Sequence, residues 1–300
     1  MSLSFIVAVS CVCGEGRAES LASLPDAQQA SWLWATVIIG AFAAVAIMVS
    51  GMWRSTRFAE VRWPFSAVES LLLFLMLQVL GALGAMIGSR LAPPQGDGAA
   101  PTLDGALWMI GAASLLQVSA LVVVLLRRRE GMHPRLHFRV GWTPALTGAI
   151  AFAAAWFPLQ AIGVAVATVQ VGLGGPAIPS EGHATLQLLG ESPLDLRQWL
   201  MMVCVVLVVP AVEEVMFRGA LLGALRRAGL SPWTAIAISA SIFALMHIPA
   251  LVDGAVAPGI AMLLALGMLL GWCAARTGSL AAPITAHALF NAVNLLQSMR

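Results

Sequence analysis

Residues 199–218 read WLMMVCVVLVVPAVEEVMFR, and this stretch places two adjacent carboxylates inside an apolar segment long enough to cross a membrane. Its first charged residue is Glu213, followed by Glu214 and then, four positions later, by Arg218. A charged side chain at the centre of a bilayer costs about 2.5 kcal/mol or more, so residues of this kind usually serve a function. The stretch therefore predicts a membrane helix that carries a functional site.

The composition of the whole chain agrees with a membrane location. The chain has 300 residues, of which 60% are hydrophobic and 10% are charged. Soluble domains are about 25% charged, so we expect an all-α fold, a polytopic membrane helix bundle. The net charge of +2 and the absence of a basic stripe give no indication of nucleic-acid binding. The basic residues are all arginine, which we interpret as bacterial codon usage.

Segments of about 20 apolar residues can span a bilayer, and the sequence contains about eight of them. The expected spans are Ser31–Trp53, Pro64–Ser89, Gly105–Leu126, Trp142–Val171, Trp199–Arg218, Pro232–Leu251, Ala255–Ala275 and Ser279–Met299. Arginines concentrate in alternate connections, which predicts a multi-pass protein of the cell (inner or plasma) membrane with both termini outside. Residues 1–30 read as a poorly specified leader, residues 31–198 hold four helices with their loops, and residues 199–299 hold four more.

The two carboxylates have different helical neighbours. Arg218 follows Glu214 by four residues, so the two share a face and can form an ion pair. Glu213 is rotated by roughly 100° from that face and is freer to accept a proton, as a general base must. Counting helical rise from a turn at Gly229 gives about 24 Å to Glu213 and about 27 Å to His247, so these two are expected at similar depth.

The last helix carries a second polar pair, His287 and Asn291, four residues apart on one face. These side chains could donate hydrogen bonds to an oxyanion, bind a metal or hold helices together. His287 lies only about 12 Å along the helix from Ser279, so it reaches the depth of Glu213 only if the Gly229 hairpin protrudes or the last helix starts deeper. On the preceding hairpin Phe243 shares a face with His247, and its ring is expected to pack over the site.

Several function classes lack their motifs in this sequence. There is no His-Glu-x-x-His, no Gly-x-Ser-x-Gly, no membrane aspartate pair and no Walker motif. The remaining histidines fall in predicted loops, where we expect them to be solvated; they are His133, His137 and His183.

Three motifs in three successive apolar segments resemble those of one known family. They are Glu213-Glu214-x-x-x-Arg218-Gly219, Phe243-x-x-x-His247 and His287-x-x-x-Asn291. Together they resemble the CPBP family, the CAAX proteases and bacteriocin-processing enzymes, also called the type II CAAX prenyl endopeptidase or Abi family. The resemblance covers about residues 199–299, which it implies to be a catalytic core within an eight-helix membrane bundle.

The resemblance implies an integral-membrane endopeptidase that acts on a membrane-associated peptide or protein at the lipid bilayer. Glu213 and His247 would activate a water molecule, and His287 and Asn291 would hold the oxyanion. Supporting roles would fall to Glu214, Arg218 and Phe243. Members of the family have been described as metalloproteases and as metal-independent glutamate proteases. We favour a reaction without a cofactor; zinc or another divalent metal stays open, with Glu213, His247 and His287 as its ligands.

Two other functions stay open from the sequence. The chain could be a noncatalytic membrane scaffold or immunity protein that retains the fold, or a proton-coupled transporter that uses Glu213 and His247 as a relay. The absence of internal repeats and paired broken helices argues against the transporter. Because the composition is bacterial in character, a leader peptide or anchored regulator is a more fitting substrate than a prenylated protein.

Overall fold

The computed structural model describes residues 35–45, 58, 65–92, 102–129, 142–177, 179, 182–191 and 195–299. These residues are helical apart from short connections and one isolated β-bridge between His183 and Leu251. After a helix at Ala35–Val45, the elements are α3 (Ala67–Leu91), α4 (Leu103–Arg129), α5 (Trp142–Gly172), α6 (Ala184–Glu191), α7 (Leu196–Val203), η3 (Cys204–Val208), α8 (Val209–Glu214), η4 (Val215–Leu221), α9 (Leu222–Arg227), α10 (Pro232–Met246), η5 (Ile248–Ala250), α11 (Val256–Thr277) and α12 (Ala281–Ser298).

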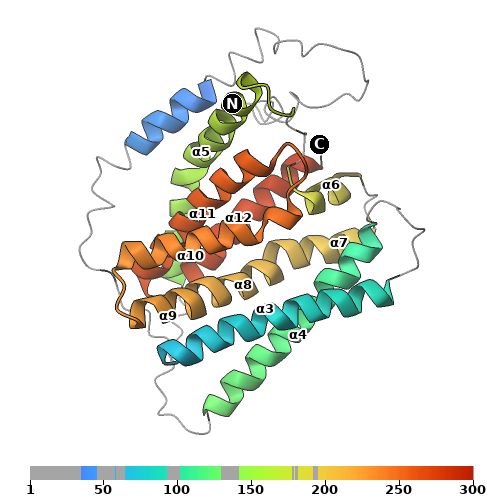
Figure 1. The fold of residues 1–300 in the computed structure, drawn as a ribbon, viewed down its shortest axis with the longest axis vertical. Coiled ribbons are helices and arrows are strands. Elements are labelled where there is room, and N and C mark those ends of the chain that lie inside the picture. The colour runs from blue at the N-terminus through green and yellow to red at the C-terminus, as the bar shows by residue number, and fades with distance from the viewer. Residues whose placement is uncertain are drawn as a thin grey trace.

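The elements form a bundle in which one long rod runs through the middle (Figure 1). This rod is the continuous helix from α7 to α9, 32 residues from Leu196 to Arg227. The α3–α4 hairpin packs on one side of the rod, and α10, α11 and α12 pack on the other, with α5 against α11 and α12 (Figure 1). The rod carries both glutamates, so they lie between two groups of helices.

The polytopic helix bundle predicted from the sequence is confirmed. Six helices within the described ranges are long and apolar enough to cross a membrane: α3, α4, α5, the α7–α9 rod, α10 with η5, and α11. The expected span Ser279–Met299 is the helix α12, which is not among the six because His287, Asn291 and Asn294 lower its hydropathy. The expected span Ser31–Trp53 is described only at Ala35–Val45, and the leader over residues 1–30 lies outside the described residues.

Local side-chain chemistry sets several helix ends. At the start of α3 the backbone N–H of Ser66 donates to Glu69 Oε2 at 2.8 Å, and the N–H of Glu69 donates to Ser66 Oγ at 3.3 Å. This reciprocal cap satisfies two N–H groups that have no partner inside the helix. At the other end of the chain α11 stops at Gly278, whose φ of +64° is a left-handed conformation that favours glycine.

Glycine allows close helix contacts at two interfaces. A Cβ on Gly88 of α3 would lie 2.2 Å from the carbonyl oxygen of Trp108 in α4. A Cβ on Gly148 of α5 would lie 2.0 Å from the carbonyl oxygen of Ala282 in α12. Membrane helices that lack a side chain at the contact approach this closely and gain van der Waals packing. The second contact fixes the start of the helix that carries His287.

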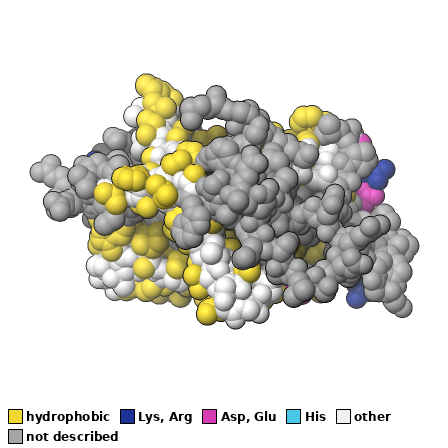
Figure 2. Space-filling view, turned by 90° about the horizontal axis from the view of Figure 1, so that it is seen from above, with side chains coloured by type: hydrophobic (Ala, Val, Ile, Leu, Met, Phe, Trp, Pro, Cys, Tyr) yellow, Lys and Arg dark blue, Asp and Glu magenta, His cyan; other side chains and the backbone are white. Residues whose placement is uncertain are grey.

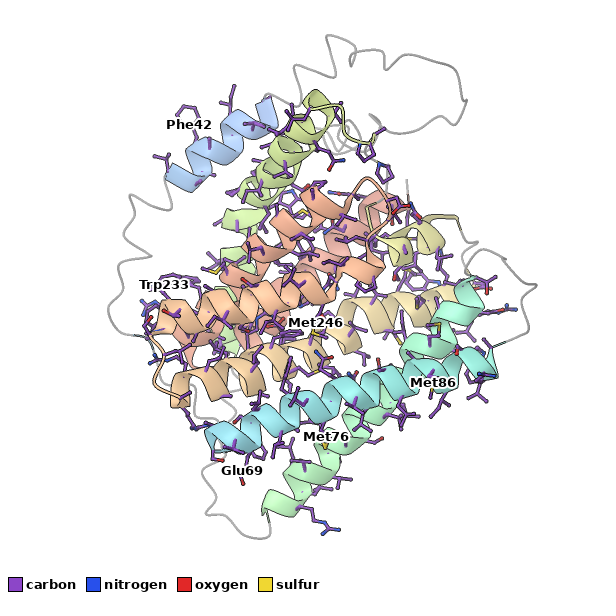
Figure 3. All side chains as sticks on the ribbon, in the orientation of Figure 1. Phe42, Glu69, Met76, Met86, Trp233 and Met246 are labelled. Atoms are coloured by element: carbon purple, nitrogen blue, oxygen red, sulfur yellow. The ribbon has the colours of Figure 1, made fainter. Side chains whose placement is uncertain are left out.

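The outer surface is mostly apolar. Phe42 is 74% exposed and Met86 is 58% exposed, and both project outward from their helices (Figure 3). Seen from above, uncharged side chains cover most of the described surface, while acidic and basic side chains gather at one end (Figure 2). At this scale an exposed apolar surface marks contact with a membrane rather than with water.

Candidate active site

Two π-helical segments flank the pair of glutamates on the rod. The segment η3 precedes α8, and η4 follows it directly after Glu214. In η3 the N–H of Val209 donates to the carbonyl of Cys204, five residues back, so the matching partner of the Val205 carbonyl would be residue 210. That residue is Pro210, which has no N–H, and the Val205 carbonyl is left free of the helix.

The freed carbonyl of Val205 is bound by Asn291. The Asn291 side chain donates from Nδ2 to the Val205 oxygen at 2.8 Å, joining α12 to the rod. In η4 the Phe217 carbonyl likewise accepts a bond from Ser239 Oγ on α10 at 3.1 Å. Each π segment thus offers a backbone oxygen to a neighbouring helix, which fixes the rod against α10 and α12.

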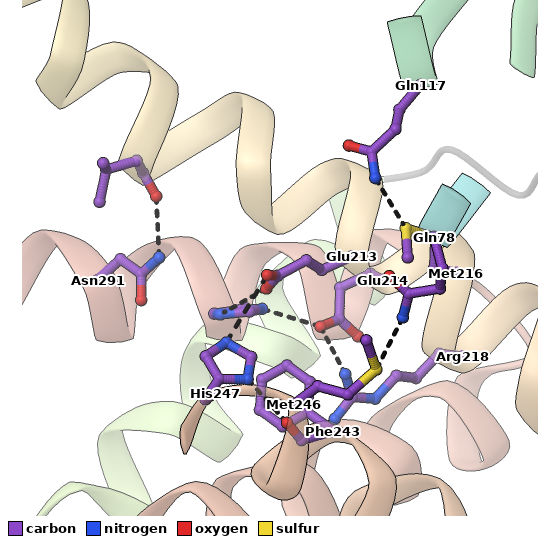
Figure 4. A network of polar contacts seen from close by, with 12 residues as sticks. Gln78, Gln117, Glu213, Glu214, Met216, Arg218, Phe243, Met246, His247 and Asn291 are labelled. Carbon is purple, nitrogen blue, oxygen red and sulfur yellow. Dashed lines mark hydrogen bonds and ion pairs between the residues drawn. The ribbon is translucent and has the colours of Figure 1, made fainter. Parts of the chain in front are cut away.

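Glu214 lies at the centre of a buried polar network (Figure 4). Its Oε1 accepts from Arg218 Nη1 at 2.9 Å and from His287 Nδ1 at 2.9 Å. Arg218 Nη2 in turn donates to the carbonyl of Gly267 in α11 at 3.2 Å. Glu214 and Arg218 are both 0% exposed. The predicted Glu214–Arg218 pair is confirmed, and it also connects the rod to α11 and α12.

Glu213 faces two imidazole rings instead of the guanidinium. His247 Nε2 lies 3.7 Å from Glu213 Oε1, and His287 Nε2 lies 3.7 Å from Glu213 Oε2. The side chain of Glu213 is 22% exposed, unlike that of its neighbour Glu214. The adjacent carboxylates therefore have the separate environments that their helical spacing predicts, and the accessible one stands between two histidines.

Hydrogen-bond geometry fixes the protons on both rings. His247 Nδ1 lies 2.7 Å from the carbonyl oxygen of Phe243, which can only accept, so this nitrogen carries the proton. His287 Nδ1 donates to the carboxylate of Glu214 in the same way. In the neutral rings both Nε2 atoms then present lone pairs toward Glu213. Glu213 and His247 together can accept a proton from a molecule bound among them, and His287 would donate there only when its Nε2 is also protonated.

Phe243 packs over the site, as its spacing from His247 predicts. Its ring centroid lies 4.4 Å from that of His247 and 5.7 Å from that of His287. The guanidinium carbon of Arg218 lies 4.6 Å from the same centroid. One buried aromatic ring thus contacts both histidines and the cation.

The contact between His287 and both glutamates resolves the difference in depth that the sequence left open. His287 is eight residues past Ser279, whereas Glu213 is 16 residues before Gly229. Because the side chains meet, the hairpin between α9 and α10 must extend about 12 Å beyond the connection between α11 and α12. The condition stated from the sequence is therefore met: relative to α12, the hairpin protrudes, which is the same as saying that α12 starts deeper.

Asn291 lies apart from this cluster, toward the adjacent part of the rod (Figure 4). Its bond to Val205 uses one of its two amide hydrogens, and the other remains for a further acceptor. Its assignment to an oxyanion site stays a prediction. The sequence did contain a sign of the observed bond, because Pro210 stands five residues after Val205.

The donor types around Glu213 suit a divalent metal, since each ring presents Nε2 while its Nδ1 binds an acceptor. Within the part of the chain that the structure describes, no three His, Cys, Asp or Glu side chains form a group that could hold a metal ion. Glu213, His247 and His287 stay the candidate ligands of a divalent metal, and the reaction proposed below passes through none.

Residues 195–293 match the family model described as type II CAAX prenyl endopeptidase Rce1-like. This segment is similar to the CAAX endopeptidases. The resemblance read from the three motifs is confirmed, and the Rce1-like segment contains every residue assigned to the site. No curated protein and no solved structure matches the chain. The match and the six apolar helices together indicate that the chain is a multi-pass membrane protein and that its Rce1-like segment contacts the bilayer.

One residue near the Rce1-like segment was assigned wrongly from the sequence. His183 was expected to be a solvated loop residue, but it is partly buried and pairs with Leu251 in an antiparallel bridge. Its backbone position, shortly before α6, gave no periodic signal that could have placed it beside the segment that follows His247. The other two loop histidines lie outside the described residues.

Proposed function

We propose that the protein is an integral-membrane endopeptidase that hydrolyses a peptide bond close to the membrane surface. The observation that carries this proposal is Glu213 placed between the Nε2 atoms of two histidines, each 3.7 Å away. One accessible carboxylate next to a buried, paired carboxylate is an arrangement that suits general-base catalysis. The match to the Rce1-like family supports the same reaction class.

In the proposed reaction Glu213 and His247 accept a proton from a water molecule. The resulting hydroxide attacks the carbonyl carbon of the scissile peptide, and the carbonyl oxygen becomes an oxyanion. The tetrahedral intermediate then breaks at its C–N bond, and the proton held by Glu213 and His247 passes to the leaving amine. The products are a carboxylic acid and an amine, which together contain the atoms of one water.

His287 and Asn291 are assigned to the oxyanion. His287 needs a proton on Nε2 to donate, and the Glu214 carboxylate at 2.9 Å from its Nδ1 would stabilise the imidazolium that results. For Asn291, the bond to the Val205 carbonyl would hold the amide so that its second hydrogen keeps one direction. Preorganised donors of this kind typically contribute about 10²–10³ in rate, which is the scale expected for each side chain.

We further propose that the protein lies in the inner or plasma membrane with both termini outside, as the distribution of arginines predicts. The substrate is a membrane-associated peptide, either a leader or an anchored regulator. Apolar walls around the site would exclude bulk water and strengthen the electrostatic interactions of the reacting groups.

The test compares membrane peptides from cells that carry the wild type, Glu213→Gln or no protein. Cleavage products that depend on wild type and disappear in Glu213→Gln support the endopeptidase. A variant that folds and keeps the full biological effect would refute it in favour of a noncatalytic scaffold. Uptake into proteoliposomes that depends on pH and survives His287→Ala would instead favour a transporter.

A further inference from the structure

The loop before α6 is attached to the segment that follows His247. His183 and Leu251 form an antiparallel bridge, and the N–H of Val252 donates to the Gly182 carbonyl at 3.2 Å. A second contact lies close by, where Gln170 Nε2 donates to the Gly254 carbonyl at 2.8 Å. Two connections distant in the sequence are thus held together at the end of α10.

This attachment brings His183 close to His247. The chain between His247 and Leu251 is a tight turn in which the N–H of Ala250 donates to the His247 carbonyl at 2.9 Å. A 3₁₀ turn rises about 2 Å per residue, so Leu251 lies within roughly 8 Å of His247 along the chain.

The ring of His183 has a defined tautomer. The backbone N–H of Thr185 donates to His183 Nδ1 at 3.2 Å, so Nδ1 is an acceptor and the proton lies on Nε2. Burial first, and the nearby His247 second, lower the pKa of His183 to about 4. The ring is therefore neutral near pH 7. No acceptor for its Nε2–H is present among the residues whose placement the structure gives.

A neutral N–H at a partly buried position is suited to a neutral acceptor, because it brings no charge that would require a counter-ion. On a peptide the commonest such acceptor is a backbone carbonyl oxygen. The cation Arg218 and the carboxylate Glu214 are already paired with each other. His183 is thus a hydrogen-bond donor near the reacting groups that the proposed chemistry does not use.

We propose that His183 is a substrate-binding residue of the endopeptidase site, and that its Nε2–H donates to a backbone carbonyl of the bound peptide beside the scissile bond. The inference rests on the proposed function. It adds a fixed recognition point from outside the Rce1-like segment, contributed by the loop between α5 and α6. Through the bridge to Leu251, this donor is held in register with His247.

A purely structural role for His183 is the competing explanation, because its Nδ1 and its carbonyl both cap the start of α6. Two variants separate the roles. His183→Asn keeps a short side-chain acceptor for the Thr185 N–H, since asparagine is among the best N-cap residues, but it loses the donor at the Nε2 position. His183→Gln weakens the cap but places an amide N–H at about the reach of Nε2.

The experiment uses the full chain in proteoliposomes and a pool of fluorescence-quenched peptides, half of them carrying a farnesylated C-terminal cysteine motif. Loss of one neutral hydrogen bond predicts that KM rises about 3- to 10-fold in His183→Asn, with kcat within about 2-fold and an unchanged unfolding midpoint. In His183→Gln we expect KM to return toward the wild-type value although the midpoint falls.

Three other outcomes would contradict the inference. Wild-type KM in His183→Asn refutes it and leaves the proposed function intact. A loss of activity that follows the unfolding midpoint in both variants assigns His183 to the cap alone. An absence of cleavage by the wild type, with the pool cleaved by a soluble protease as control, refutes the proposed function and this inference with it.

Discussion

The same substitution, glutamate to glutamine, should affect different properties at the two adjacent positions: stability at Glu214 and cleavage at Glu213. Glu214→Gln removes the charge that accepts from both Arg218 and His287, each at 2.9 Å. Hydrogen bonds to charged groups contribute about 1.5–3 kcal/mol each, and breaking one side of a buried ion pair costs about 3–5 kcal/mol. Glutamine keeps an acceptor at the same place, so we expect a loss of about 3 kcal/mol in the free energy of unfolding.

Glu213→Gln serves as the matched control. The Glu213 side chain is 22% exposed, and the nearest imidazole nitrogens, those of His247 and His287, are each 3.7 Å away. Its replacement should change the free energy of unfolding by no more than about 0.5 kcal/mol while it abolishes cleavage. The assay is circular dichroism of the purified protein during titration with a denaturing detergent, together with peptide cleavage.

A double substitution tests whether the cost comes from the unpaired cation. Arg218, which is fully buried, would remain charged in Glu214→Gln. Replacing both residues by apolar ones of similar size, Glu214→Leu with Arg218→Met, should destabilise less than the sum of the two single changes. The reasoning is refuted if Glu214→Gln unfolds within 1 kcal/mol of wild type, or if Glu213→Gln is equally destabilised.

Further expectations concern packing, the freed carbonyl, pH and metal. Gly148→Ala should displace α12 and destabilise by about 1–3 kcal/mol, measured by detergent titration, whereas Gly111→Ala, which meets nothing within 4 Å, should not. Asn291→Ala should lower the free energy of unfolding by about 1–2 kcal/mol, because the Val205 carbonyl loses its hydrogen bond. The loss should be smaller in a Pro210→Ala background, where the new N–H of residue 210 can bind the Val205 carbonyl. The pKa of His183 is lowered from 6.5 to about 4 in the folded protein, so the free energy of unfolding should fall as pH drops from 6.5 to 4. The fall should be smaller in His183→Asn, and an equal dependence of unfolding free energy on pH in the two proteins would contradict this. Activity should survive a chelator in protein of measured metal content, and stoichiometric zinc lost together with activity would overturn the reaction proposed above.

The helices could be predicted from the sequence because each apolar segment is long enough to be read alone. The pairing of Glu214 with Arg218 was equally local, since it depends only on the four-residue spacing within one helix. The contact of His247 with Glu213 followed from counting residues on either side of one turn. These predictions needed no knowledge of how distant helices pack.

The rest of the site depended on packing between helices. Whether His287 reaches the glutamates depends on how far the α9–α10 hairpin extends past α12, and no residue count within one element gives that. The bond from Asn291 to Val205 required knowing that the rod becomes π-helical before Pro210. His183 was assigned to solvent because loop residues carry no periodicity that would show their contacts.

The ion pair between Glu214 and Arg218 has a consequence for biosynthesis. Its other partners lie further along the chain, Gly267 by 49 residues from Arg218 and His287 by 73 from Glu214, so they leave the ribosome later. The pair itself is complete within two turns of one helix. The apolar part of the rod, residues 199–225, holds two glutamates and one arginine, so it enters the bilayer with one ion pair and one unpaired anion rather than with three unpaired charges. The chain can insert this segment first and assemble the reactive site around it once the last helix arrives.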